Sequence, residues 1–378
     1  MIPYGRQSIS EADIEAVVEV LRSDFLTQGP VVPRFEQAVA DYCGARFGVA
    51  VNSGTAALHI ACLALGVGPG DWVWTSPISF VASANCALYC GAQVDFVDIE
   101  PDTGNMCVLE LERKLMVAKA EGRLPKVVIP VHFAGLPCDM KEIHRLGREY
   151  GFRIIEDACH ALGARYHDEP TGNGRYSDIT VFSFHPVKII TTGEGGMAMT
   201  NDPALAKTMR MLRSHGITRE PEDFINEPDG PWYYEQQMLG FNYRMTDIQA
   251  ALGLSQMARL DFFIAARQAL ATCYQRNLPG YIERQVSREE RQSAWHLFVI
   301  QVPLSLRAKI FQALREEGIG ANVHYIPITQ QPYHNPKVLQ SAARFYEQAI
   351  TLPLYPTMEA STITRIVRAA ALRFASPV

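Results

Sequence analysis

Short apolar runs alternate with segments of helical periodicity along most of the chain. The apolar runs are bounded by glycine, proline and polar residues, and they stand at 47–51, 72–75, 93–98, 127–131, 152–157, 179–184 and 197–199. Such runs are typical of buried strands. Helical spacing of apolar residues occurs between them, at 31–43, 56–65 and 204–214. Strands that alternate with helices predict an α/β fold with a largely parallel, doubly wound sheet, and ligands bind such sheets at the carboxyl ends of the strands.

The chain opens with a helix signal. Ser10 and Asp13 have the spacing of a capping box, and an apolar stripe follows at Ile14, Val17, Val18 and Leu21. This pattern predicts an amphipathic helix that ends near Ser23. A later polar stretch, 216–231, has no periodicity and is rich in acidic residues, proline and glycine. It predicts a surface excursion or a mobile lid.

The last third of the chain has a different pattern. A strand is predicted at 295–302, a helix at 306–317 that stops at Gly318, and an amphipathic helix at 360–374. We therefore expect two domains, a large one at 1–258 and a smaller α+β domain at 259–378.

Composition excludes several classes of protein. The 378 residues are 48% hydrophobic and 20% charged, which is usual for a soluble globular protein. A net charge of −5 does not indicate the excess of basic residues that nucleic-acid binding needs. The eight cysteines form no CxxC pair and no zinc spacing, so we expect no metal site and a cytoplasmic chain with reduced thiols. Cys86 and Cys90, one helical turn apart, are interpreted as core residues. We expect no membrane span, because the charge-free stretch between Asp71 and Asp95 is interrupted by Pro77 and polar residues.

Lys188 is the first candidate for chemistry. It lies just after the strand at 179–184, which His185-Pro186 ends, and before glycines at 193, 195 and 196. Desolvation lowers the pKa of a lysine, and its neutral amine can form a Schiff base. A loop lysine that points at water is the alternative for this residue taken alone.

Two further strand ends carry candidate groups. The strand at 47–51 runs through Ser53, Gly54 and Thr55 into a helix, whose free N–H groups favour a phosphate, although small residues also cap ordinary helices. Asp157 ends the strand at 152–157, where a carboxylate can equally cap a helix. Phe80 lies in the exit loop of the strand at 72–75, a place where aromatic residues are usually core.

Three segments together resemble one enzyme family. The run SFHPVK at 183–188, TTGEGG at 191–196 and DACHALG at 157–163 resemble the motifs of nucleotide-sugar aminotransferases. These are pyridoxal-phosphate (PLP) enzymes of the DegT/DnrJ/EryC1/StrS family, within the aspartate-aminotransferase superfamily. The resemblance extends from the N-terminal IPY to HYIP at 324–327, nearly end to end, and this coverage is stronger evidence than any single motif.

The resemblance implies the fold type I large domain of PLP enzymes, a homodimer and a set of cofactor contacts. Lys188 is implied as the covalent anchor and catalytic base. The other implied cofactor-binding residues are Gly54, Thr55, Phe80, Asp157, His160, Ser183 and, from the other subunit, Asn242. One position departs from the usual pattern, because Cys159 stands where many members carry alanine. His160 stands where many members carry glutamine, and a histidine here is similar to the branch that aminates 4-ketosugars.

The resemblance also implies the substrates, a UDP-sugar and L-glutamate. Substrate contacts are implied for Tyr4, Asp24, Phe25, Leu26, Thr27, Gly54, Ser183, Asn242, His324, Tyr325, Ile326 and Pro327. The sequences of the segments IPYGRQ, SDFLTQGP and FHPVK are most similar to the pseudaminic-acid branch, which aminates C4 of a UDP-4-keto-6-deoxy-N-acetylhexosamine. The alternatives are a 4-aminotransferase for UDP-4-keto-arabinose or a 4-keto-6-deoxyglucose derivative, and a non-catalytic regulatory PLP binder. Related dehydratases replace the lysine by histidine, so Lys188 argues against that class.

Overall fold

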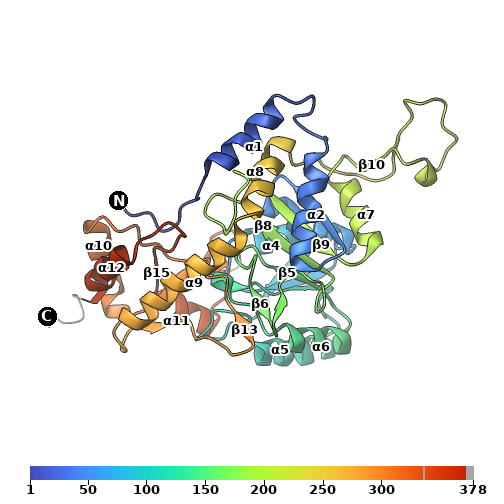
Figure 1. Cartoon of the computed structure of the whole chain (residues 1–378). Helices are drawn as coiled ribbons and strands as arrows, with labels where there is room; N and C mark the ends of the chain where they lie inside the picture. Colours follow the sequence, from blue (N-terminus) through green and yellow to red (C-terminus); the bar gives the residue numbers. More distant parts are fainter. Residues whose placement is uncertain (335–336, 372–378) are drawn as a thin grey trace.

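A single mixed sheet organises most of the chain (Figure 1). The computed structural model describes residues 1–334 and 337–371. Seven strands lie in the order β1-β9-β8-β5-β4-β2-β3. Their bounds are β1 (Phe47–Val51), β2 (Trp72–Thr75), β3 (Gln93–Phe96), β4 (Val127–Ile129), β5 (Arg153–Asp157), β8 (Ile179–Ser183) and β9 (Gly196–Thr200).

The sheet is parallel except for β9. Strands β3, β2, β4, β5 and β8 pair in parallel, whereas β9 runs antiparallel to both β8 and β1. Each predicted apolar run forms one of these strands, so the predicted α/β fold with a mostly parallel sheet is confirmed. The carboxyl ends of β5 and β8 therefore meet at one edge of the sheet.

Helices cover both faces of the sheet. On one face, α3 (Gly54–Ala64), α4 (Ala82–Tyr89) and α7 (Pro203–Leu212) share a hydrophobic core with the strands, and Cys86 and Cys90 lie in this core as predicted. Other helices pack on the opposite face, and alternate strand residues point to each side. These helices are α2 (Val31–Cys43), α5 (Val108–Ala120), α6 (Met140–Tyr150), α8 (Asp247–Met257) and the start of α9 (Leu260–Asn277).

The predicted first helix is α1 (Glu11–Leu21), and its capping box forms between Ser10 and Asp13. The buried carboxylate of Asp13 accepts hydrogen bonds from Ser255 and Gln256 of α8, which fixes α1 on that helix. Two members of the predicted apolar stripe, Ile14 and Leu21, are nevertheless exposed in the single chain.

The polar stretch after α7 leaves the body of the molecule as a long excursion (Figure 1). It contains the two-residue strands β10 (Ile217–Thr218) and β11 (Glu235–Gln236) and a 3₁₀ turn at Pro221–Asp223. The predicted surface excursion is confirmed, and its role as a lid stays a prediction.

The C-terminal third builds a second core on a small antiparallel sheet. The sheet comprises β12 (Glu283–Arg284), β14 (Phe298–Gln301) and β15 (Ala349–Leu352), and its helices are α10 (Leu304–Glu316), α11 (Gln340–Gln348) and α12 (Ala360–Ala371). The strand predicted at 295–302 starts later, because Trp295 has a φ of 51° that breaks the extended conformation. The end of the helix predicted at 360–374 lies outside the described residues.

A third small sheet and the N-terminal arm connect the two parts. The sheet joins β13 (Arg291–Gln292) to β6 (Arg165–Tyr166) and β7 (Glu169–Pro170). Ile2 pairs with Ile319 and belongs to the C-terminal core, so the arm brings Tyr4 toward that part. Further 3₁₀ turns lie at Phe133–Gly135 and Ile328–Gln330. The division at residue 258 stays a prediction. Within 1–334 and 337–371, no helix combines the length and the apolar character needed to cross a membrane.

Candidate active site

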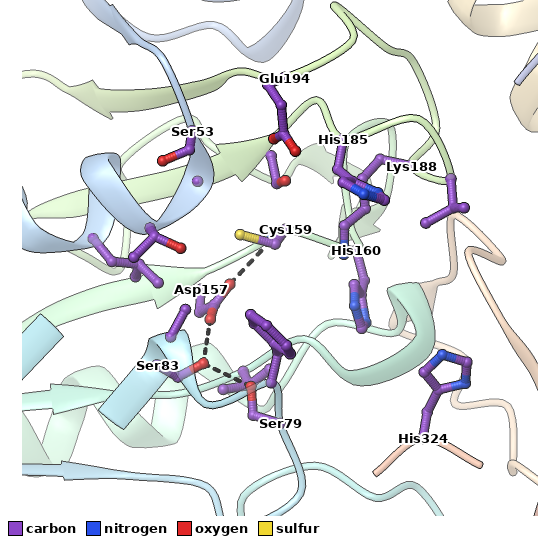
Figure 2. A pocket seen from close by; sticks show the side chains of 18 of the residues that line it. Ser53, Ser79, Ser83, Asp157, Cys159, His160, His185, Lys188, Glu194 and His324 are labelled. Atoms are coloured by element: carbon purple, nitrogen blue, oxygen red, sulfur yellow. Dashed lines mark hydrogen bonds between the residues drawn. The ribbon is translucent and has the colours of Figure 1, made fainter. Parts of the chain in front are cut away.

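A cavity of about 870 Å³ opens at the carboxyl edge of the central sheet (Figure 2). It brings together residues that are far apart in the sequence. The predicted site residues that line it are Tyr4, Gly54, Thr55, Phe80, Asp157, His160, Ser183, Lys188, His324 and Tyr325.

Lys188 lies on the loop that links β8 to β9. The loop is held at both ends, because the Phe184 N–H donates to the carbonyl of Gly195 and the Thr192 N–H donates to the carbonyl of Phe184. Removal from water lowers the pKa of Lys188, although the neighbouring acidic groups of Cys159 and Asp157 oppose this shift. A lowered pKa increases the fraction of neutral, nucleophilic amine. The alternative of a solvated loop lysine is therefore not supported.

Asp157 is buried at the end of β5, and its carboxylate is held by defined donors. Oδ2 accepts a hydrogen bond from Ser83 Oγ at 2.6 Å, and Oδ1 accepts one from the Cys159 N–H at 3.2 Å. Because Ser83 donates to the carboxylate, Ser79 donates to Ser83 across 2.6 Å. No helix starts at Ala158, so the helix-cap alternative for Asp157 is wrong.

The start of α3 forms a narrow cradle beside β8. Ser53 caps this helix, since its Oγ accepts the Ala56 N–H at 3.1 Å. The first helical turn leaves further N–H groups available to an anion. A Cβ on Gly54 would lie 2.9 Å from Ser183 Cβ, so a side chain at this position would fill the cradle. The geometry fits a phosphate held against backbone.

A cluster of neutral aromatic side chains forms the opposite wall. His160 Nε2 lies 3.1 Å from the Tyr325 hydroxyl, and His160 Nδ1 is buried without a hydrogen-bond partner among the described residues. Burial lowers the pKa of His160 well below its usual value and that of His324 to about 3. His324 Nδ1 is anchored 2.9 Å from Thr351 Oγ1, and the Tyr4 ring packs against the His324 ring.

Several predicted residues lie outside this lining. Asp24, Phe25, Leu26 and Thr27 form the exposed connection between α1 and α2, with Phe25 54% and Leu26 47% exposed. Ile326 and Pro327 follow Tyr325 but do not line the cavity.

Asn242 is exposed, and its carbonyl lies 3.4 Å from Asn52 Nδ2. Its position before α8 would also suit a helix cap, but Asn242 does not cap this helix, because Thr246 does so in a capping box with Gln249. Phe80 is 59% exposed at the cavity, so the core alternative for this residue is also wrong.

Further residues of the lining were not predicted from the sequence. Asn52, Ser79, Ser83, Cys159, Glu194 and Gln249 also face the cavity. Cys159 and Glu194 stand inside the motifs that carried the resemblance, which gave a signal for them. The Ser79/Ser83 pair has helical i, i+4 spacing, but nothing local connects it with Asp157.

Nearly the whole chain matches a known protein family. The DegT/DnrJ/EryC1/StrS aminotransferase family matches residues 7–371. The chain belongs to this family. The predicted family and its fold type I architecture are thereby confirmed, and the protein is a PLP-dependent aminotransferase acting on a sugar.

Relatives of this aminotransferase cover nearly the whole chain. The spore coat polysaccharide biosynthesis protein SpsC of Bacillus subtilis is 37% identical over 97% of this chain and 96% of its own. The UDP-4-amino-4,6-dideoxy-N-acetyl-beta-L-altrosamine transaminase of Campylobacter jejuni is 35% identical, with 95% and 93% covered. Helicobacter pylori PseC, an aminotransferase of pseudaminic acid biosynthesis, has a similar structure with a TM-score of 0.90 at 32% identity, covering 99% of both chains.

The family's cofactor, PLP, fits the residues present. A solved neighbour, Spr1654 of Streptococcus pneumoniae, exists in PLP and PMP forms, and its PMP form has a TM-score of 0.90 at 31% identity over 99% of both chains. In this chain a primary amine, a buried carboxylate, a glycine cradle at a helix start and an unpartnered imidazole nitrogen surround one cavity. These groups match the aldehyde, ring nitrogen, phosphate and phenolic oxygen of PLP.

Proposed function

We propose that this aminotransferase transfers the amino group of L-glutamate to C4 of a UDP-4-keto-6-deoxy-N-acetylhexosamine. The product would be UDP-4-amino-4,6-dideoxy-N-acetyl-β-L-altrosamine, a precursor of pseudaminic acid. Two observations support this choice of substrate, namely the Campylobacter jejuni transaminase and the Helicobacter pylori PseC structure. The observation that carries the catalytic part is the meeting of Lys188 and Asp157 in one cavity.

The predicted cofactor-binding residues that line the cavity each have a proposed role. Lys188 anchors PLP covalently, Asp157 pairs with the ring nitrogen, and Phe80 stacks on the ring. Gly54, Thr55 and Ser183 hold the phosphate, and His160 faces the phenolic oxygen. When bound, PLP acts as an electron sink for the carbanion that forms at the reacting carbon.

Lys188 moves the proton in this proposal. Its neutral amine, favoured by the lowered pKa, takes the proton from Cα of glutamate and delivers a proton to C4 of the sugar in the second half of the reaction. The loop that carries Lys188 is tied to β8 and β9 at both ends, which confines the amine to the reacting carbon.

Asp157 keeps the ring nitrogen protonated. Its carboxylate is buried and oriented by Ser83 and the Cys159 N–H, so its remaining lone pairs are directed at the cavity. A charge-assisted hydrogen bond between carboxylate and ring N–H is shorter and stronger than a neutral one. The Ser79–Ser83 pair thus acts on the reaction through Asp157.

The charge balance of the cavity supports a shared active site. Lys188 is the only lysine or arginine among the described residues that line it. The phosphate, the sugar diphosphate and the carboxylates of glutamate would all enter this space. We propose that a second copy supplies further hydrogen-bond donors to these anions, and that the side-chain amide of Asn242, which is exposed and does not cap its own helix, is one of them.

Exposed apolar side chains support the same homodimer. Ile14 and Leu21 on α1 and Phe25 and Leu26 after it are exposed, on the segment that precedes α2. A two-fold interface that covers them would bury apolar area and bring the predicted substrate residues 24–27 to a neighbouring cavity. The position of these residues outside their own cavity is then explained.

The test is a nitrogen-transfer assay. Purified enzyme with PLP receives ¹⁵N-labelled glutamate and, in parallel, the proposed UDP-4-ketosugar, UDP-4-keto-arabinose or a 4-keto-6-deoxyglucose nucleotide, and NMR reads the nitrogen at C4. We expect the highest kcat/KM with the proposed sugar. A higher value with another ketosugar would overturn the substrate, whereas failure of glutamate alone to change the cofactor absorbance would overturn the amino donor.

A further inference from the structure

His160 and Tyr325 form a hydrogen-bonded pair in the cavity wall, with the labelled ring of His160 between Cys159 and His324 in Figure 2. His160 Nε2 and the Tyr325 hydroxyl oxygen are 3.1 Å apart, and the two rings are nearly parallel, with an interplanar angle of 22°. The buried ring of His296 also packs against His160, at a centroid distance of 4.4 Å. The imidazole is therefore fixed in orientation.

The direction of this hydrogen bond follows from the protonation of both partners. Burial raises the pKa of Tyr325, so its hydroxyl keeps its proton, and burial lowers the pKa of His160 well below its usual value, so its ring is neutral. The hydroxyl has no other hydrogen-bond acceptor in the described parts of the chain. If Nε2 carried the ring proton, the Tyr325 O–H and the lone pair of Nδ1 would both lack a partner among the described residues, whereas donation by Tyr325 leaves only the Nδ1 N–H without one. Tyr325 therefore donates to Nε2.

A donation to Nε2 places the single ring proton on Nδ1. This nitrogen is buried and has no hydrogen-bond partner among residues 1–334 and 337–371. An unsatisfied buried donor on a ring that lines a cavity indicates an acceptor supplied by a bound group. The phenolic oxygen of PLP, which is negatively charged or shares a proton, is such an acceptor.

We propose that Tyr325 is a positioning residue that sets the tautomer of His160, so that Nδ1 donates a hydrogen bond to the phenolic oxygen of PLP. The inference rests on the proposed placement of His160 beside that oxygen. Without the tyrosine hydroxyl, the ring can place its proton on Nε2 and turn the lone pair of Nδ1 toward an oxygen that is also electron-rich. Tyr325 belongs to the HYIP segment, which is predicted to contact the substrate, so this segment would also affect the bound cofactor through His160.

Tyr325→Phe is the direct perturbation, because it removes the hydroxyl and keeps the ring. The tautomer is read by NMR of protein labelled with ¹⁵N-histidine, where protonated and bare ring nitrogens resonate far apart and His160→Ala assigns the signals. We expect a proton fixed on Nδ1 in the PLP-loaded wild type and a shift of the proton toward Nε2 in Tyr325→Phe.

Cofactor affinity gives the second readout, independent of turnover. In the Lys188→Ala background, where PLP binds without a covalent bond, Tyr325→Phe should raise the Kd for PLP about fivefold, as expected for one hydrogen bond. His160→Ala should also raise the Kd for PLP. Adding Tyr325→Phe to His160→Ala should not change the Kd further, because Tyr325 acts on PLP only through His160.

Two results would overturn the proposal. A proton that stays on Nδ1 in Tyr325→Phe would show that the hydroxyl does not set the tautomer. An equal loss of PLP affinity with and without His160 would show that Tyr325 contacts the cofactor directly. Neither result depends on which sugar is aminated, so the nitrogen-transfer assay can fail while this proposal holds.

Discussion

Replacing Asp157 tests the catalytic core of the site. Asp157→Asn keeps the shape of the side chain and removes its charge, and Asp157→Ala removes the side chain altogether. The carboxylate is buried and held by Ser83 and the Cys159 N–H, so solvent weakens its interaction little. We expect both variants to bind PLP and to lose most of their rate, because a ring nitrogen without its proton is a poor electron sink.

The magnitude follows from the bond that is lost. A hydrogen bond to a charged group contributes about 1.5–3 kcal/mol. If the bond acts fully in the transition state, kcat for the glutamate half-reaction should fall between roughly 12-fold and 150-fold. Ser83→Ala removes only one donor to the carboxylate, so its effect should be smaller than that of either Asp157 variant.

The assay is a single-turnover measurement of the cofactor absorbance after mixing with glutamate, with PLP content and Tm recorded for each variant. Asp157→Asn serves as the packing control, because it leaves no cavity behind. A rate loss below about tenfold, roughly 1.4 kcal/mol, in a fully loaded and normally folded variant would refute the assignment of Asp157 to the ring nitrogen.

Three further predictions concern the anchor, the cradle and the second subunit. Lys188→Ala should fold and lose turnover, and borohydride reduction of the wild type should leave the cofactor on the peptide that carries Lys188; label on another lysine would contradict the assignment. Gly54→Ala should weaken PLP binding about tenfold or more and cost about 1–3 kcal/mol of stability, because its Cβ would lie 2.9 Å from Ser183 Cβ; unchanged Kd and Tm would exclude a tight cradle. Mixing Lys188→Ala chains with Asn242→Ala chains should restore activity in heterodimers if the site is shared.

The subunit-mixing result has a clear alternative. In a shared site, one cavity of the heterodimer holds both defects and the other holds neither. If Asn242 served its own subunit, each cavity would keep one defect and activity would stay at the level of the parents. Confirmed heterodimers without recovery, formed from an Asn242→Ala parent that is severely impaired, would reject the shared site.

Much of the fold and the centre of the site could be predicted from sequence. Buried strands are apolar on both faces, so their ends are visible as the first polar or proline residue, and Asp157 and Lys188 stand at or just past such ends. A sheet edge then brings them together without any knowledge of side-chain contacts. The predicted strand at Trp295 failed because a left-handed φ leaves no periodic signal.

Contacts between distant segments could not be predicted in this way. Ser83 reaches Asp157 across 74 positions in the sequence, and only the packing of α4 over the sheet makes them neighbours. Sequence position alone also allows Asn242 to cap α8, but Thr246 is the cap, because Gln249 completes the reciprocal pair of hydrogen bonds with it. Similarly, His160 Nδ1 has no acceptor among the described residues because of the way the folded chain buries it, and the sequence does not show this.

β9 lies between β1 and β8 and runs antiparallel to both, so the cofactor site can form only late in folding. Phe47 pairs with Thr200, so β1 must wait for a strand about 150 residues later in synthesis. The cradle follows β1 and the anchor precedes β9, and the two halves of the PLP site exist only once this long-range pairing has formed. Free PLP at 100 times its Kd would then add about 2.7 kcal/mol to the folded state by mass action. The supply of the vitamin B6 cofactor would thus set how much newly made enzyme survives, as well as how fast it turns over.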